Sequence, residues 1–248
     1  MSNYDSGLNL LKTGLSELNI NLSDEQISQF IKYYEYLVEK NKVMNLTAIT
    51  AFEEVIIKHF LDSLSFVKAI DVKCLAGLEL IDIGTGAGFP GIPLKIAFPE
   101  LNITLLDSLN KRINFLNEVI NMLSLESVKA IHGRSEEFGV KEEYREKFDI
   151  CVSRAVSNLS TLSEFCLPFV KVGGQFISYK AGDSDDEIKE AEYAINLLGG
   201  KIKEEILFTV PNSDISRKLV VIDKIKNTGK KYPRKAGTPL KSPIKIPQ

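Results

Sequence analysis

The sequence predicts an α/β fold built on a mostly parallel sheet of seven strands. After Leu78, short apolar runs alternate with segments of helical period, a pattern typical of parallel strands joined by helices. The first run ends in an acid and a glycine-rich turn, and the last two runs have no helix between them. These observations predict a ligand site at the end of the first strand and an antiparallel hairpin at one sheet edge.

The first 75 residues are predicted to form a helical extension. Leucines recur at helical spacing over Leu8–Leu18, and Ser23 with Gln26 has the form of a capping box that opens a second helix. A polar break at 41–47 precedes a third helix, expected over 52–70. We expect this extension to pack on the sheet domain.

The sheet domain is expected over residues 76–226. The predicted strands are 78–83, 102–107, 127–132, 148–153 and 174–180, followed by the hairpin runs 201–210 and 217–226. One predicted helix begins near Pro90, and three others span 111–123, 159–170 and 184–198. Ligands of such open sheets bind beyond the carboxyl ends of the strands, so the residues that follow each strand are the candidate site.

The turn after the first strand contains two overlapping cofactor fingerprints. Its glycines Gly84, Gly86 and Gly88 form an acid-x-Gly-x-Gly-x-Gly pattern with Asp82, typical of S-adenosylmethionine enzymes, while 86–91 fits the Gly-x-Gly-x-x-Gly of dinucleotide binders. Asp107, at the end of the second strand, can accept the ribose hydroxyls of either cofactor. Asp82 favours the cationic methyl donor over a pyrophosphate, although it could instead cap the N–H groups of its own turn.

Two later strand ends carry further candidates. Glu136 follows the third strand, where it could contact an adenine edge or simply begin a helix. Arg154 ends the fourth strand, and an arginine after an apolar run requires either a ligand or an ion-pair partner. Both alternatives remain open for each residue.

Composition narrows the class of protein. A chain of 248 residues with 44% hydrophobic content can bury one sizeable core, and no apolar run approaches the roughly 20 residues of a membrane span. No secretory signal is recognisable at the start, so a cytoplasmic location without membrane association is expected. Three widely spaced cysteines, of which Cys151 and Cys166 lie in apolar stretches, and two histidines predict neither disulfides nor a metal site.

Charge is distributed unevenly along the chain. Positions 215–248 hold ten Lys or Arg residues and one Asp, a net +9, which leaves −11 for positions 1–214 of a chain whose net charge is −2. A basic end on an acidic body suggests a polyanion such as nucleic acid, or alternatively a solvated basic tail. Aromatic and proline residues between the charges favour an ordered, extended segment over 227–248.

The whole chain resembles the RsmG family, also named glucose-inhibited division protein B, of bacterial small-subunit ribosomal RNA guanine-N7 methyltransferases. The resemblance covers nearly the full length and is carried by 45–49, 58–63, 82–93, 105–108, Lys111-Arg112, 134–138, Ser153-Arg154-Ala155 and 232–239. Where the family has Lys-Gly after its fifth strand, this chain has Lys180-Ala181, which leaves the backbone at Ala181 in question.

The resemblance implies a Rossmann-like class I methyltransferase fold with S-adenosyl-L-methionine as methyl donor. It implies methylation of one guanine N7 in the decoding-region loop of 16S ribosomal RNA, free or in a small-subunit particle, by a protein expected to act as a monomer. The implied cofactor contacts are Gly84 and Phe89 in the turn, Asp107, Ser108 and Leu109 at the ribose, Ser135 and Glu136 at the adenine, and Arg154 near the methionine end.

Guanine N7 carries no proton, so no catalytic acid or base is expected, and positioning of the reactants should dominate. The candidates for RNA contact are His59, Asp62, Arg112, Arg154, Lys180, Arg217, Arg234 and Lys235. His59 could equally be a satisfied core histidine. A dinucleotide-dependent oxidoreductase and a noncatalytic RNA-binding protein remain as alternative functions.

Overall fold

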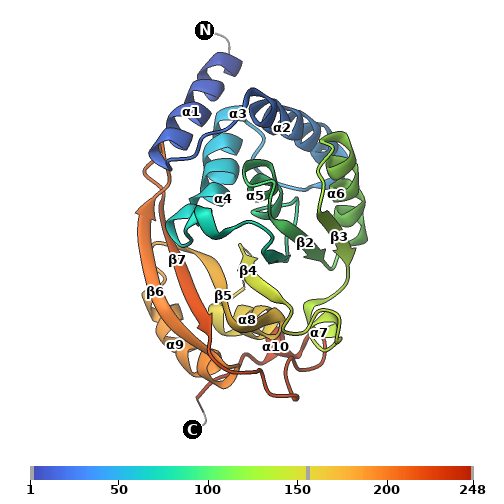
Figure 1. The fold of residues 1–248 in the computed structure, drawn as a ribbon, viewed down its shortest axis with the longest axis vertical. Coiled ribbons are helices and arrows are strands. Elements are labelled where there is room, and N and C mark those ends of the chain that lie inside the picture. The colour runs from blue at the N-terminus through green and yellow to red at the C-terminus, as the bar shows by residue number, and fades with distance from the viewer. Residues whose placement is uncertain (1–2, 155–156, 247–248) are drawn as a thin grey trace.

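A seven-stranded sheet forms the centre of the molecule in the computed structural model, which describes residues 3–154 and 157–246 (Figure 1). The strand order is β3-β2-β1-β4-β5-β7-β6. The strands are β1 (Glu79–Ile83), β2 (Asn102–Asp107), β3 (Val128–His132), β4 (Phe148–Ser153), β5 (Val170–Ala181), β6 (Gly200–Thr209) and β7 (Ser216–Lys224). The first five pair in parallel, while β7 pairs antiparallel with both β5 and β6. The predicted α/β class and C-terminal hairpin are therefore confirmed.

One boundary differs from the prediction. The helix expected over 159–170 is α8 (Leu159–Cys166), which a short 3₁₀ turn (Leu167–Phe169) follows, and β5 begins at Val170 instead of 174. Pro168 explains why α8 ends, because a proline has no N–H to donate to the helix carbonyl four residues earlier.

The N-terminal residues are helical, as expected. They form α1 (Asn3–Glu17) and α2 (Asp24–Met44), and α2 begins with the predicted capping box between Ser23 and Gln26. The third predicted helix is a continuous helical path of four parts: α3 (Phe52–Val55), a π-helical turn (Ile56–Leu61), α4 (Asp62–Leu64) and a 3₁₀ turn (Ser65–Lys68). A π-helical turn often occurs at a functional site.

Helices cover both faces of the sheet (Figure 1). The longer ones after β1 are α5 (Gly91–Ala97), α6 (Asn110–Met122) and α9 (Asp185–Leu197), and a 3₁₀ turn (Val72–Cys74), α7 (Ser135–Phe138) and α10 (Thr238–Lys241) are short elements absent from the prediction. Two buried apolar clusters result. Alternate β1 residues enter different clusters: Leu80 packs with the N-terminal helices, whereas Ile81 packs with α8 and α9.

The basic C-terminal residues pack on the domain. Tyr232 and Ile244 are buried in the cluster that contains α8 and α9, so the expected ordered segment is confirmed as far as residue 246. Cys151 and Cys166 are buried, as predicted, and Cys74 is exposed. Among the described helices, none has the length and apolar character needed to cross a bilayer.

Candidate functional site

A cavity of about 240 Å³ lies at the carboxyl ends of the parallel strands. Five of the predicted cofactor residues line it, contributed by the segments after β1, β2 and β3: Gly84, Asp107, Ser108, Ser135 and Glu136. Its wall also includes apolar side chains, among them Leu162 and Phe165 of α8. The structure thus assembles in one place residues that lie more than 50 positions apart in the sequence.

The glycine turn has the left-handed backbone that its sequence predicts. Gly84, Gly86 and Gly88 have φ angles of 71°, 63° and 100°. A Cβ at Gly88 would lie 2.6 Å from Ile92 and 2.9 Å from the Tyr33 hydroxyl, so this glycine allows close packing against α2. Tyr33 also donates a hydrogen bond to the carbonyl of Ala87. The extension thereby fixes the turn, a role that no local sequence pattern indicates.

Asp82 is fully buried at the base of the turn and does not line the cavity. Its Oδ2 accepts hydrogen bonds from Thr85 Oγ1 (2.7 Å) and from the Gly91 N–H (2.9 Å), which is the capping role considered as the alternative. Its Oδ1 has no hydrogen-bond partner among the residues that the structure describes, and burial raises the pKa of the carboxyl to about 7. An unpartnered buried carboxylate oxygen suits a nearby cationic group and would repel a pyrophosphate.

Asp107 is held in place by backbone and side-chain donors. Its Oδ2 accepts from the Gly86 N–H (2.9 Å) and its Oδ1 from the Leu109 N–H (2.9 Å). Arg112, predicted on the RNA side, instead forms an ion pair with Asp107 at 3.2 Å and lines the same cavity. The carboxylate therefore has a fixed position above the turn, as recognition of ribose hydroxyls requires.

Glu136 is buried, and the C-terminal segment provides one of its partners. Its Oε1 accepts from the Gly237 N–H (2.8 Å), and its Oε2 accepts from Ser135 Oγ (3.3 Å). Leu240 of α10 lines the cavity as well. Inspection of strand ends alone could not find Gly237 and Leu240, because both lie beyond the last strand.

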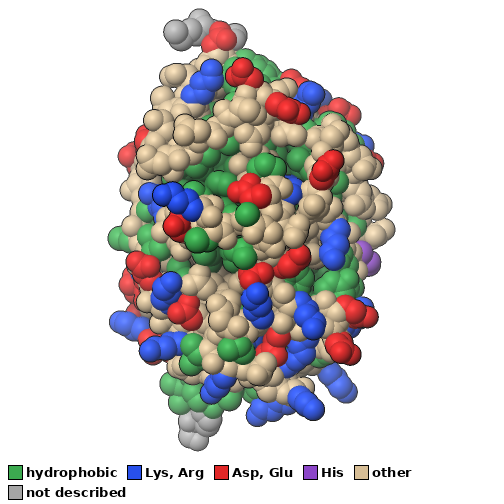
Figure 2. Space-filling view, viewed as in Figure 1, with side chains coloured by type: hydrophobic (Ala, Val, Ile, Leu, Met, Phe, Trp, Pro, Cys, Tyr) green, Lys and Arg blue, Asp and Glu red, His purple; other side chains and the backbone are tan. Residues whose placement is uncertain are grey.

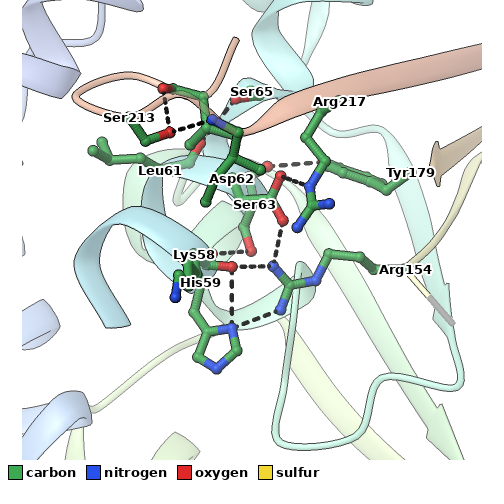
Figure 3. A network of polar contacts seen from close by, with 12 residues as sticks. Lys58, His59, Leu61, Asp62, Ser63, Ser65, Arg154, Tyr179, Ser213 and Arg217 are labelled. Carbon is green, nitrogen blue, oxygen red and sulfur yellow. Dashed lines mark hydrogen bonds and ion pairs between the residues drawn. The ribbon is translucent and has the colours of Figure 1, made fainter. Parts of the chain in front are cut away.

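A polar network beside the turn joins the N-terminal helical path to the sheet (Figure 3). Arg154 Nη1 donates to Asp62 Oδ2 (2.8 Å) and to the Lys58 carbonyl (2.9 Å). Arg217 of β7 approaches the other Asp62 oxygen at 3.3 Å. The predicted residues Asp62, Arg154 and Arg217 are thus neighbours, with Asp62 between the two guanidinium groups.

His59 completes this network as a neutral, buried side chain. Arg154 Nη2 lies 3.1 Å from His59 Nδ1, and because arginine only donates, Nδ1 accepts and Nε2–H donates to Thr47 Oγ1 at 2.8 Å. Burial and the Arg154 charge lower the pKa of His59 to about 3. Its ring stacks on Phe89 at 4.5 Å, and the Arg154 guanidinium lies 5.2 Å from the same ring. Of the two interpretations, the structure thus favours the satisfied core histidine.

The other predicted RNA contacts separate into paired and exposed residues. Lys180 is buried and pairs with Glu187 at 2.6 Å, and Arg234 pairs with the fully buried Glu164, also at 2.6 Å. Both side chains are held in ion pairs, and their contact with RNA stays a prediction. Lys235 is exposed. Ala155, part of the motif around Arg154, lies outside the described residues.

Comparison with known proteins extends these observations. The profile of the GidB family, described as rRNA small subunit methyltransferase G, matches residues 26–219. A protein of Lachnoclostridium phytofermentans named ribosomal RNA small subunit methyltransferase G is 57% identical over 93% of this chain and 95% of its own length. One of the same name from Alkaliphilus metalliredigens is 54% identical over 95% and 98%.

Solved structures show the fold alone, because their sequences are distant. TrmN from Thermus thermophilus has a TM-score of 0.52 at 12% identity and covers 68% of this chain and 53% of its own. M. jannaschii TYW2, solved in complex with AdoMet, has a TM-score of 0.50 at 15% identity and covers 66% and 77%. The sequence matches, which span most of both chains, show that this chain belongs to the GidB family, rRNA small subunit methyltransferase G.

Proposed function

We propose that this protein methylates N7 of a guanine in 16S ribosomal RNA, with S-adenosyl-L-methionine as the methyl donor. Methylation of small-subunit ribosomal RNA follows from the name of relatives that are 54–57% identical over nearly the whole chain. The observation that carries the cofactor assignment is the strand-end cavity, which joins the glycine turn to Asp107 and Glu136 beside the buried Asp82. The atom N7 is the finer part of the proposal and comes from the RsmG resemblance.

The residues of the cavity suit the parts of this cofactor. Asp107 is placed to accept from the ribose hydroxyls, and Ser135 and Glu136 to contact the adenine. Asp82 does not line the cavity, and its carboxyl, buried under the glycine turn, favours a cationic cofactor through its charge. When bound, S-adenosylmethionine supplies an electrophilic methyl group on a sulfonium. Arg154, fixed by Asp62, lies 5.2 Å from the ring of Phe89, which follows the glycine turn.

The protonation states fit a reaction that needs no general base. His59 has a pKa of about 3, and both of its ring nitrogens already have partners, so it is a poor proton acceptor at neutral pH. Asp82 does not line the cavity. Guanine N7 has a lone pair and no proton, so these residues need only position the base and exclude water.

Nucleoside mass spectrometry tests the proposal. We expect 16S rRNA from a strain that lacks the gene to lose one 7-methylguanosine, and expression of the wild-type gene, but not of a Gly84→Val variant, to restore it. In vitro, purified protein should transfer labelled methyl groups to that rRNA, tested both free and in small-subunit particles. A methyl group found on another atom, or on the ribose, would contradict the N7 assignment.

Ligand binding tests the two alternative functions. Stabilisation of the protein by S-adenosylhomocysteine and not by NAD would exclude the oxidoreductase. Loss of that stabilisation in Gly84→Val, together with loss of methylation, would argue against a noncatalytic RNA-binding protein.

A further inference from the structure

The C-terminal segment, residues 228–246, follows β7 and reaches the strand-end cavity. After β7 ends at Lys224, the chain crosses α8 and reaches the cavity with α10 (Figure 1). Leu240 of α10 lines the cavity, although 57% of its surface is exposed to solvent. A ligand that covers this leucine with an apolar surface removes apolar area from water, which favours binding.

Buried polar contacts fix this segment in position. Glu164 of α8, which is fully buried, accepts from the Arg234 backbone N–H (2.8 Å) and pairs with its guanidinium (2.6 Å). Further along α8, Thr161 Oγ1 donates to the Pro239 carbonyl (3.2 Å) and Ser160 Oγ to the Ile244 carbonyl (2.7 Å). These anchors lie on both sides of Leu240, so the position of its side chain is defined by the folded domain.

The same segment holds a carboxylate of the cavity. Gly237 donates its N–H to Glu136 Oε1 at 2.8 Å, and Gly237 precedes Leu240 by three residues. The hydrogen bond from Gly237 brings the segment that contains Leu240 to Glu136, and the apolar side chains Leu162 and Phe165 of α8 also line the cavity. A flat, largely apolar group with polar edges matches this combination of a carboxylate and aliphatic and aromatic surface.

We infer that the C-terminal segment completes the cofactor site and that Leu240 is an apolar contact for the adenine. The inference rests on the cofactor named under the proposed function and adds a residue to its binding site. It also gives the segment a role besides that of a basic surface for RNA.

Isothermal titration calorimetry with two ligands tests this role. S-adenosylhomocysteine carries both the adenosine and the amino acid, whereas 5′-methylthioadenosine lacks the amino acid. We expect Leu240→Ala to weaken the binding of both ligands by a similar factor, roughly five- to tenfold, because the leucine side chain packs on the adenine that they share. Asp82→Asn should instead weaken S-adenosylhomocysteine more than methylthioadenosine.

Two further variants control for folding and for general effects on the segment. Ile246→Ala removes an equally exposed side chain (67%) that lines a different groove, and it should bind both ligands as the wild type does. Leu240→Met should retain most of the affinity. Unfolding midpoints of the Leu240 and Ile246 variants should lie close to that of the wild type, because the altered side chains are exposed.

The outcomes are distinct. Wild-type affinity of Leu240→Ala for both ligands would overturn the inference, and so would a loss confined to S-adenosylhomocysteine, which would place Leu240 at the amino-acid end. A wild-type protein that binds neither ligand would overturn the proposed cofactor and the inference together. The assay contains no RNA, so a failure of the N7 proposal does not alter its result.

Discussion

Protonation of the buried Asp82 makes the stability of the protein depend on pH. Its pKa in the folded protein is about 7 against an ordinary 3.8, because burial disfavours the charged carboxylate. The folded state therefore holds the proton more tightly, and stability is lost as pH rises from about 4 through 7. The position retains an acid despite this loss, which is what a binding role for the charge would require.

Replacing this acid tests the link. The side chain introduced by Asp82→Asn does not titrate, whereas the wild type loses stability as the pH rises. The free energy of unfolding of the variant minus that of the wild type should therefore increase by roughly 1 to 3 kcal/mol from pH 5 to pH 8. Urea unfolding of both proteins at the two pH values measures the change. An identical difference at both pH values would mean that the Asp82 pKa is not raised in the folded protein.

His59 titrates in the opposite sense. Its folded pKa is about 3 and its ordinary value 6.5, so the stability that the neutral ring contributes is complete above pH 6.5 and is lost as pH falls toward 3. The wild type loses this stability as the pH falls, whereas the His59→Gln variant has no imidazole to protonate. Any deficit in the free energy of unfolding of the variant should therefore shrink by roughly 1 to 2 kcal/mol from pH 7.5 to pH 4.5. Urea unfolding of both proteins at the two pH values measures this change, and a deficit that is the same at both would contradict it.

At the scale of elements, one acid fixes the N-terminal helical path to the sheet. Asp62 follows the π-helical turn and is only 2% exposed, and it pairs with Arg154 after β4 and with Arg217 of β7. The pairs lie 92 and 155 positions apart in the sequence. Removal of the shared acid leaves two partly buried guanidinium groups without their partner.

We expect Asp62→Asn to lower the free energy of unfolding by about 2 to 4 kcal/mol. Glu54→Gln is the matched control on the same helical path, because it breaks the exposed Glu54–Lys58 pair and should change stability by less than about 0.5 kcal/mol. Chemical denaturation of both variants measures the contrast. Equal effects of the two substitutions would show that the Asp62 network does not hold the extension to the sheet.

At the scale of the whole molecule, basic side chains are distributed unevenly. On the face shown in Figure 2, Lys and Arg side chains gather in the lower half, the region of α8, α9 and α10 in Figure 1. The exposed lysines of the C-terminal segment are 230, 231, 235, 241 and 245. Arg234, in contrast, pairs with the buried Glu164 and so helps to fix the segment on α8.

The salt dependence of RNA binding tests this surface. Changing Lys230, Lys231, Lys235 and Lys241 together to Gln should weaken binding and reduce the slope of log affinity against log salt by about 0.7 for each phosphate that a lysine no longer neutralises. A control variant with Lys12, Lys32, Lys201 and Lys203 changed to Gln, all exposed outside the segment, should keep the wild-type slope. An unchanged slope in the first variant would exclude these four lysines as phosphate contacts.

The sequence by itself determined the order of strands and helices, the capping box at Ser23 and the left-handed glycine turn. These features depend on neighbours within a few positions, whose periodicity and backbone preferences are local. Most predicted cofactor residues follow strands directly, and parallel strands bring their carboxyl ends together, so the cavity could also be anticipated.

Only the tertiary structure decided which charged groups are paired and which are exposed. Arg154 and Arg234 are both arginines in polar motifs, and nothing local shows that one meets Asp62 and the other Glu164. The same holds for Leu240, which reaches the cavity because α8 anchors the segment around it. These two ion pairs join residues 92 and 70 positions apart, which folding brings together, and sequence periodicity carries no information about such partners.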